Sequence, residues 1–254
     1  MKFKLQLFRP PQKIEKIDAF KQELIDSGSS AESKTLDETI IDAHFLEYMS
    51  YPISSSYKDV FLSSIKGLVK NDYLSPSINW REAVHRLDCF GWEDVRNDIL
   101  TYFTSNVQGR LFPTTGSSKE MELHFVGHLG YCHIGNNRLV AAKAWLTHKY
   151  KDEAQLLNID CTIRELYPEY KLILEQSLKQ ESKLSLGYSD RWGILYNNRD
   201  IKNIMRIDIK ESGTKFYEVS GSKPTEIKGL INKWLCRLVT YNLLNKNFIK
   251  LILK

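Results

Sequence analysis

The sequence predicts an α+β protein with a helical N-terminal region, a small mixed sheet with helices in the middle, and a C-terminal hairpin followed by a long helix. Apolar residues recur at helical spacing through most of residues 1–106. Short apolar runs bounded by turn residues follow within 107–182, as expected of strands. Residues 183–254 end in an amphipathic pattern with basic residues. No change of composition marks a linker, so the three regions are expected to form one compact body.

The N-terminal region is expected to contain one strand and four or five helices. The segment KFKLQLF alternates, which predicts a strand with Phe3, Leu5 and Leu7 on one face. Gly28 and Pro52 are typical of positions at or beyond a helix end. The expected helices cover residues 10–28, 36–52, 54–74 and 78–106, with a break in the last near residue 91.

The rest of the chain alternates between predicted strands and helices. The predicted strands lie within 121–135, turning near 128–130, and over 156–163, 205–211 and 215–220; the predicted helices cover 136–150, 167–180 and 224–253. In the closing helix the apolar residues recur at i, i+3 and i+4, which favours core packing. These residues are Ile227, Leu230, Ile231, Trp234, Leu235 and Leu238.

Composition limits the class of protein. The 254 residues can bury a sizeable core, and 42% apolar with 26% charged residues is ordinary for a globular chain. The apolar runs are too short for a membrane-spanning helix, which needs about 20 residues. Arg9 and two prolines interrupt the N-terminus before a signal peptide could form, so a cytoplasmic protein is expected. Four widely spaced cysteines, without a CxxC pair, predict reduced thiols: Cys89, Cys132, Cys161 and Cys236.

Positive charge gathers at the C-terminal end of the chain. The net charge is +5, and the segment from Ser222 to Lys254 holds seven basic residues and one acidic residue. A basic tail on a nearly neutral body indicates contact with a polyanion, while the alternative is a solvated helix face. The candidate residues for binding nucleic acid are Lys228, Lys233, Arg237 and Lys246.

The stretch CHIGNNRLVAAKAW, from Cys132 to Trp145, places a glycine, two amides and a cation between a strand and an Ala-rich helix. Free N–H groups and the dipole at a helix N-terminus favour an anion. Gly135 allows close approach of a ligand, and the Asn136 and Asn137 amides can donate or cap. A cation in the first turn of a helix is unfavourable for the helix dipole. A contact between Arg138 and a phosphate would explain its presence there. A capped helix with a surface ion pair is the alternative interpretation.

This segment resembles the ParB/sulfiredoxin-like superfamily, whose members carry a strand, a GxxR turn, an Ala-rich helix and a second strand. The matching residues are YCHIGNNRLVAAKAW followed by LLNIDCTI. Upstream, DILTYFTSNVQGRLFP is similar to the family's helix, glycine turn and proline-containing strand entry. The resemblance covers roughly residues 95–163 and implies a small mixed sheet with helices.

The resemblance implies a nucleotide-binding protein. By analogy, Gly135, Asn136, Asn137 and Arg138 bind the phosphates of a nucleoside triphosphate, ATP or CTP, and His133 lines the site. Family members include CTP-dependent DNA clamps, sulfinic-acid reductases and small-molecule kinases. NTP hydrolysis or phosphoryl transfer, with DNA or RNA as an associated partner, is therefore the expected function. The many Lys, Ile and Asn residues fit a phage or mobile-element context.

Departures from the family pattern restrict the reactions that this chain is expected to catalyse. Asn136 stands where the reductases carry their catalytic cysteine, which argues against reductase activity. Ile134 replaces the usual aspartate before the glycine, and the two amides offer no evident acid or base. The catalytic residues therefore remain unassigned. Acidic residues that could hold Mg²⁺ are Asp88, Glu93, Asp94 and Asp98.

Histidines gather in HFVGHLGYCH, where His124, His128, Cys132 and His133 could ligate zinc. Side chains alternate along a strand, so His124 and His128 share parity while His133 lies opposite unless the turn changes the register. No second cluster such as CxxC accompanies them. The sequence therefore predicts no metal site.

Two other functions remain open. An HNH-type metal-dependent nuclease needs a histidine base, an asparagine and a metal-binding histidine, an order that His124, Asn137 and His148 follow. HNH nucleases place the metal-binding histidine nine positions after the asparagine. In this chain the spacing is eleven positions, which argues against this alternative. The other alternative is a non-enzymatic module that binds nucleic acid or protein through its basic C-terminal helix.

Overall fold

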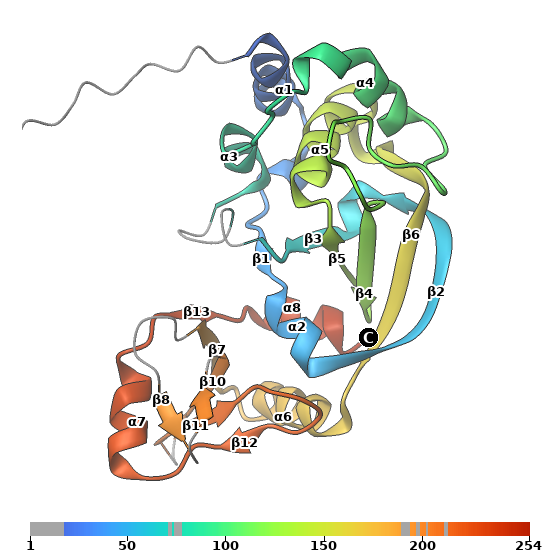
Figure 1. Cartoon of the computed structure of the whole chain (residues 1–254). Helices are drawn as coiled ribbons and strands as arrows, with labels where there is room; N and C mark the ends of the chain where they lie inside the picture. Colours follow the sequence, from blue (N-terminus) through green and yellow to red (C-terminus); the bar gives the residue numbers. More distant parts are fainter. Residues whose placement is uncertain are drawn as a thin grey trace, which may run out of the picture.

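The computed structural model describes residues 18–70, 73, 78–188, 194–196, 199–201, 203–210 and 213–254. The strand expected near the N-terminus and the beginning of the first expected helix lie outside these ranges. The α+β class is confirmed, because helices accompany a mixed six-stranded sheet and a second, antiparallel sheet. Figure 1 shows the two sheets in separate parts of the molecule, with α2 and α8 between them.

The six-stranded sheet has the order β1-β3-β5-β4-β6-β2. The pairs β1–β3, β3–β5 and β4–β6 are parallel, while β4–β5 and β2–β6 are antiparallel. The sheet therefore combines strands of the N-terminal region with those around the central hairpin. Its strands are β1 (Ile41–Asp42), β2 (Ser50–Phe61), β3 (Ile65–Leu68), β4 (Glu122–Val126), β5 (Leu129–Ile134) and β6 (Gln155–Leu166).

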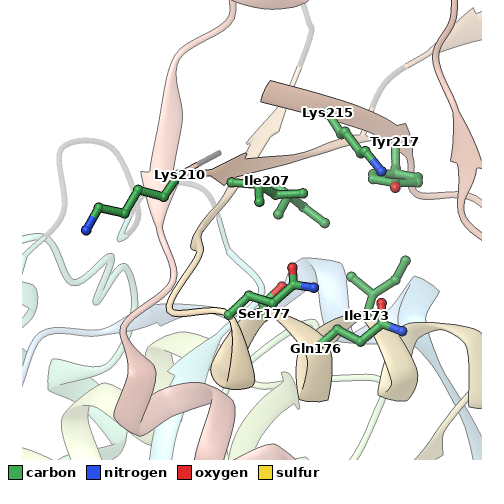
Figure 2. A pocket seen from close by; sticks show the side chains of 9 residues that line it. Ile173, Gln176, Ser177, Ile207, Lys210, Lys215 and Tyr217 are labelled. Atoms are coloured by element: carbon green, nitrogen blue, oxygen red, sulfur yellow. The ribbon is translucent and has the colours of Figure 1, made fainter. Parts of the chain in front are cut away.

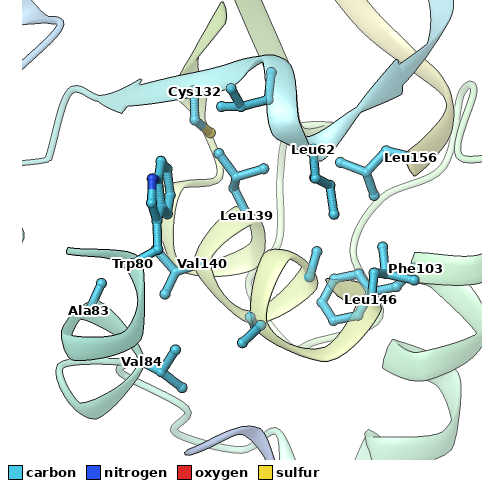
Figure 3. Close-up of a cluster of buried hydrophobic side chains, with 14 of the residues drawn as sticks. Leu62, Trp80, Ala83, Val84, Phe103, Cys132, Leu139, Val140, Leu146 and Leu156 are labelled. Atoms are coloured by element: carbon cyan, nitrogen blue, oxygen red, sulfur yellow. The ribbon is translucent and has the colours of Figure 1, made fainter. Parts of the chain in front are cut away.

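One face of this sheet is covered by four helices that form the larger core. Figure 3 shows Leu139, Val140 and Leu146 of the central helix among side chains of its neighbours. Trp80 and Phe103, both buried, belong to the same cluster. The helices are α1 (Ala19–Ser30), α3 (Trp80–His85), α4 (Arg96–Thr104) and α5 (Asn136–Tyr150), and 3₁₀ turns cover Lys34–Leu36, Leu62–Ser64, Glu93–Val95 and Lys151–Glu153.

The other face of the sheet packs on a second core. Val126, Leu129 and Tyr131 enter this core together with apolar residues of three helices and the second sheet. The second sheet has the order β12-β11-β10-β7-β13, and β8 pairs with β9 separately. The elements are α2 (His44–Met49), α6 (Pro168–Lys179), α8 (Lys246–Ile252), β7 (Lys183–Tyr188), β8 (Ile194–Tyr196), β9 (Arg199–Ile201), β10 (Asn203–Ile209), β11 (Gly213–Glu218), β12 (Thr225–Glu226) and β13 (Tyr241–Leu243).

The sequence prediction was accurate around the central hairpin. Strands β4 and β5 join through Gly127 and His128, and α5 covers the predicted residues 136–150. Gly135 is the N-cap of α5 with φ of 94°, a left-handed conformation that glycine adopts without a Cβ penalty. Strand β6, helix α6 and the β10–β11 hairpin also agree with prediction.

The helices predicted over 36–52 and 54–74 were largely wrong. Among the described residues of this stretch, helical structure is confined to the short α2 and to 3₁₀ turns, and residues 50–61 form the long strand β2. The apolar residues of this stretch fit a helical spacing, but Ser54–Ser56 and Pro52 are poor helix formers. Pairing with β6 supplies the backbone hydrogen bonds of β2, so tertiary structure overrides the local spacing.

The prediction of a single C-terminal helix over 224–253 was also wrong. It is replaced by β12, α7 (Leu230–Arg237), β13 and α8. The β-branched pair Val239–Thr240 precedes β13, which pairs with β7, and Asn245 caps α8 by accepting a hydrogen bond from the Asn247 N–H.

The predicted burial of the apolar stripe was mostly incorrect. Ile227 is buried and Leu235 is half-buried, but four other members are largely exposed. Their exposed fractions are 89% for Leu230, 76% for Ile231, 57% for Trp234 and 57% for Leu238.

The four cysteines are free, as predicted, and all four are buried. Among the described helices, none combines the length and the apolar character that crossing a lipid bilayer requires.

Candidate functional site

A cleft of about 420 Å³ opens at the N-terminus of α5. It brings together the predicted turn residues, the end of β3 and a loop rich in hydroxyl groups. A volume of a few hundred Å³ is typical of small-molecule sites. The lining residues include Gly135, Asn136, Asn137, Arg138, Lys70 and, from the loop, Thr114, Thr115, Gly116 and Ser117.

Both amides of the turn hold it in place. The Asn136 side chain accepts a hydrogen bond from the Val69 N–H at 3.1 Å. The Asn137 side chain accepts from the Tyr73 hydroxyl and, at 3.3 Å, from Lys70 Nζ. These bonds fix the start of α5 against the end of β3. The amide oxygens therefore position the turn.

The backbone N–H groups at the start of α5 keep their capacity to bind a ligand. Leu139 N–H donates to the Gly135 carbonyl, and no side-chain hydrogen bond caps the helix. The N–H groups of Asn136, Asn137 and Arg138 thus have no partner within the first turn. Together with the positive end of the dipole of this 15-residue helix, they favour an anion in the cleft.

Arg138 connects α5 to the hydroxyl-rich loop. Its guanidinium donates to the Lys119 carbonyl and to Ser117 Oγ, each at 2.8 Å. It also lies 5.1 Å from the centre of the Phe112 ring. Burial lowers the pKa of Arg138, although arginine stays protonated in proteins. Arg138 therefore both adds positive charge to the cleft and orders the loop.

The rest of the lining, as far as the structure describes it, is partly aromatic and carries little negative charge. Phe112 and Trp92 pack 5.0 Å apart between ring centres, and Phe90 stands nearby with 95% of its surface exposed. Of the acidic residues suggested for Mg²⁺, Asp88 lines the cleft. Glu93 instead accepts a hydrogen bond from the Phe20 N–H. Asp94 and Asp98 are exposed and absent from the lining.

His133 was predicted to line the phosphate site, and the structure places it elsewhere. It precedes Gly135 by two residues but contacts a different group of side chains. Because neighbouring residues of a strand point to opposite faces, Cys132 enters the core under α5 while His133 faces α2. It joins His124 and Glu47 there.

Glu47, His124 and His133 form a compact polar cluster on that face. Glu47 Oε1 lies 2.9 Å from His124 Nδ1 and 3.1 Å from His133 Nδ1. The two imidazole rings stack with their centres 4.2 Å apart and an interplanar angle of 12°. On its other side, His124 Nε2 lies 2.6 Å from Glu122 Oε1. Arg164 approaches Glu47 Oε2 to 3.5 Å.

The cluster changes the ionisation of its members. Burial disfavours the ionised Glu47, but its interactions with His124 and His133 outweigh that effect and hold the pKa of Glu47 well below its ordinary value. The interaction with Glu47 raises the pKa of His133, against the opposing effect of burial. Negative Glu47 and protonated His133 therefore stabilise each other.

The parity argument in the sequence prediction missed this cluster. The two-residue turn at Gly127 and His128 pairs His124 with Tyr131, so residues of opposite parity share a face. Tyr131 and His133 are two residues apart on β5 and therefore point the same way. His128, in the turn, is exposed. The two-residue turn length could have revealed the correct register.

The three residues of the nuclease hypothesis are not brought together. His124 belongs to the cluster facing α2, and Asn137 binds the end of β3. His148 lies in the last turn of α5, where its Nδ1 contacts Ser30 Oγ of α1 at 3.1 Å. The arrangement gives no support to an HNH-type site.

The basic residues suggested for nucleic acid lie on several short elements. Lys228 precedes α7, Lys233 and Arg237 lie one turn apart on α7, and Lys246 begins α8. Lys228, Arg237 and Lys246 are exposed, and Lys233 is half-buried. They do not form one continuous helical face. Binding of nucleic acid stays a prediction.

A second pocket, of about 480 Å³, lies between α6 and the β10–β11 hairpin. Figure 2 shows Gln176 and Ser177 of α6 opposite Ile207, Lys215 and Tyr217 of the hairpin. Gln176 is exposed, and the described residues that line the pocket include no helix N-terminus. No sequence pattern indicated this pocket.

Comparisons with protein-family models, with curated proteins and with solved structures found no match for the chain. The resemblance to the ParB/sulfiredoxin-like superfamily therefore rests on the residues quoted from 95–163.

Proposed function

We propose that the protein binds a nucleotide through its phosphate groups in the cleft at the N-terminus of α5. The observation that carries the proposal is the convergence of uncapped backbone N–H groups with Lys70, Arg138 and the hydroxyl-rich loop in one cleft. Backbone N–H groups, lysine and arginine are the donors that proteins use for phosphates.

The lining also suits the rest of a nucleotide. Phe90, which is largely exposed, offers an aromatic face against which a base can stack, while the buried Phe112 and Trp92 make its surroundings apolar. Mg²⁺ is commonly held by one or two carboxylates together with substrate phosphates, and Asp88 is the residue that would serve. The proposal is restricted to binding, because the described residues that line the cleft include no histidine and, among them, one carboxylate, Asp88.

The experiment is a thermal-shift panel on the full chain with ATP, CTP, GTP and dNTPs, with and without Mg²⁺. Nucleosides and inorganic tripolyphosphate serve as matched probes. We expect the triphosphates and tripolyphosphate to raise the melting temperature and the nucleosides to have little effect. A ligand at 100 times its Kd stabilises the fold by about 2.7 kcal/mol, which such a panel detects. No shift at millimolar nucleotide, or an equal shift with nucleosides, would contradict the proposal.

Two variants test the residues. Lys70→Met removes a charge from the cleft, and Lys149→Met removes an exposed charge near the opposite end of α5. A hydrogen bond to a charged group contributes about 1.5–3 kcal/mol, so Lys70→Met should weaken binding tenfold or more while Lys149→Met leaves it unchanged. Arg138→Ala should also weaken binding at least tenfold, since it removes a cation and releases the loop at Ser117.

A further inference from the structure

We propose that Glu47, His124 and His133 form a binding site for a first-row divalent transition-metal ion such as Zn²⁺. The site lies on the face of the sheet covered by α2, apart from the cleft at the start of α5. Two imidazole nitrogens and one carboxylate oxygen all lie within 4.8 Å of one another. The inference is independent of nucleotide binding.

The spacing of the three ligand atoms fits a metal ion. Zinc binds histidine nitrogen and carboxylate oxygen at about 2.1 Å, so neighbouring ligand atoms lie about 3.0–3.4 Å apart in octahedral or tetrahedral geometry. Glu47 Oε1 is 2.9 Å from His124 Nδ1 and 3.1 Å from His133 Nδ1. Small side-chain movements would therefore admit the ion.

His133 indicates that hydrogen bonding alone leaves this cluster incomplete. Its Nδ1 is buried and pairs with Glu47 Oε1 at 3.1 Å, but this ion pair does not have the geometry of a hydrogen bond. The contact therefore lacks hydrogen-bond alignment. The parallel stack of His124 and His133 directs two imidazoles toward one carboxylate oxygen. A single cation between these atoms would satisfy all three.

The surroundings supply the support that metal-binding histidines usually have. His124 Nε2 contacts Glu122 at 2.6 Å, and Thr162 Oγ1 donates to the same Glu122 oxygen at 3.2 Å. A carboxylate behind a ligating imidazole fixes the ring and its tautomer. Arg164 lies beside Oε2 of Glu47 and is itself held in place by donating a hydrogen bond to the Ser50 carbonyl. This position of Arg164 orients Glu47 Oε1 toward the histidines.

The composition and exposure of the cluster indicate the class of ion. Imidazole nitrogens favour zinc-like transition metals over Mg²⁺ and Ca²⁺, which prefer oxygen ligands. His133 is 36% exposed, so an ion can enter from solvent, whereas the His124 side chain is 4% exposed. Three protein ligands leave at least one coordination position for water, as in catalytic rather than structural zinc sites.

The test is a titration of untagged, chelator-treated full chain with Co²⁺, followed by visible absorption, and with Zn²⁺ as competitor. We expect one Co²⁺ per chain, d–d bands of a site with nitrogen ligands, displacement by Zn²⁺ and no displacement by equimolar Mg²⁺. His133→Ala should weaken Co²⁺ binding at least tenfold. His128→Ala removes an exposed histidine of the same hairpin and should bind as the parent does.

Circular dichroism establishes that each variant is folded. Glu47→Gln keeps the size of the side chain and provides a second test should His133→Ala unfold. Binding by His133→Ala or Glu47→Gln equal to that of the parent would overturn the proposal. Absence of saturable absorption in the parent at millimolar Co²⁺ would overturn it as well, as would an equal loss in His128→Ala.

Discussion

The imidazole rings of His124 and His133 stack 4.2 Å apart although the two residues belong to different strands and are nine positions apart. The β4–β5 hairpin produces this contact, because its two-residue turn brings both side chains to the same face. Glu47, on α2, meets both rings. The cluster therefore connects α2 to the centre of the six-stranded sheet.

The cluster should give the stability a characteristic dependence on pH. The pKa of Glu47 lies below its ordinary value of 4.5, so its stabilisation is present above that pH and is lost as pH falls. The pKa of His133 is raised above 6.5, so its stabilisation is present below that pH and is lost as pH rises through the raised pKa. The contribution is greatest between these two values.

Glu47→Gln removes the carboxylate on which both shifts depend. The difference in the free energy of unfolding between parent and variant should therefore be largest near pH 5–6 and decline on either side. Urea unfolding from pH 3.5 to 8.5, with EDTA present to exclude metal, measures it. A difference that is independent of pH would show that these groups ionise alike in the folded and unfolded chain.

Lys143 should make stability rise with pH. It is fully buried in α5, where Nζ donates to the Ile65 carbonyl at 2.6 Å and lies 3.9 Å from the centre of the Trp80 ring. Burial lowers the pKa of Lys143 well below its ordinary value of 10.5. Between the folded and unfolded pKa values the unfolded chain binds one more proton, so the free energy of unfolding increases with pH.

Lys143→Met should remove this increase. The stability of the parent relative to the variant is expected to grow with pH by up to about 1.4 kcal/mol per unit below pH 10. Denaturation at several pH values measures the slope. Lys149→Met, which removes an exposed lysine of the same helix, should follow the parent. Parallel profiles for parent and Lys143→Met would mean that Lys143 is charged in the folded protein.

Gly127 should be required for the C-terminal helix to pack. It has φ of 58°, and an added Cβ would lie 2.6 Å from the Leu251 carbonyl oxygen and 2.8 Å from that of Ile252. The neighbouring His128 N–H donates to the Leu251 carbonyl at 2.9 Å. The Cβ added in Gly127→Ala would therefore clash with backbone atoms, which cannot move aside by a change of side-chain rotamer.

Gly91→Ala is the matched control, because Gly91 also has positive φ but lies in open space. A left-handed non-glycine residue costs about 1–2 kcal/mol, and Gly91→Ala should show that cost alone. Gly127→Ala should cost at least about 1 kcal/mol more, as overpacking does, and should expose the C-terminus to limited proteolysis. Equal losses in the two variants would refute the importance of the contact with α8.

The sequence predicted elements well where local signals agree with tertiary structure. Helix α5 has a glycine N-cap, an alanine-rich face and flanking strands, so its bounds could be assigned correctly. Strand β2 could not, because its partner β6 is about a hundred residues away and no local pattern encodes that pairing. The prediction of a single C-terminal helix failed for a related reason, since β13 forms by pairing with the distant strand β7.

The residues of the two candidate sites could likewise be predicted from sequence only where they are neighbours in the chain. The turn from Gly135 to Arg138 is contiguous in sequence, and its residues do line one cleft. Lys70 joins them through the parallel pairing of β3 with β5, which sequence spacing does not reveal. Glu47 joins His124 and His133 from the short helix α2, at a position predicted as part of a longer helix.

Backbone amide NMR provides the most direct test of nucleotide binding. In ¹H–¹⁵N spectra titrated with ATP or CTP and Mg²⁺, the N–H resonances of Asn136, Asn137 and Arg138 should shift progressively to saturation. Those of His148 and Lys149, at the other end of α5, should move little. Tripolyphosphate should shift the same three amides. Unchanged resonances at Asn136–Arg138 with saturating nucleotide, or shifts confined to the pocket between α6 and β10, would contradict the proposal.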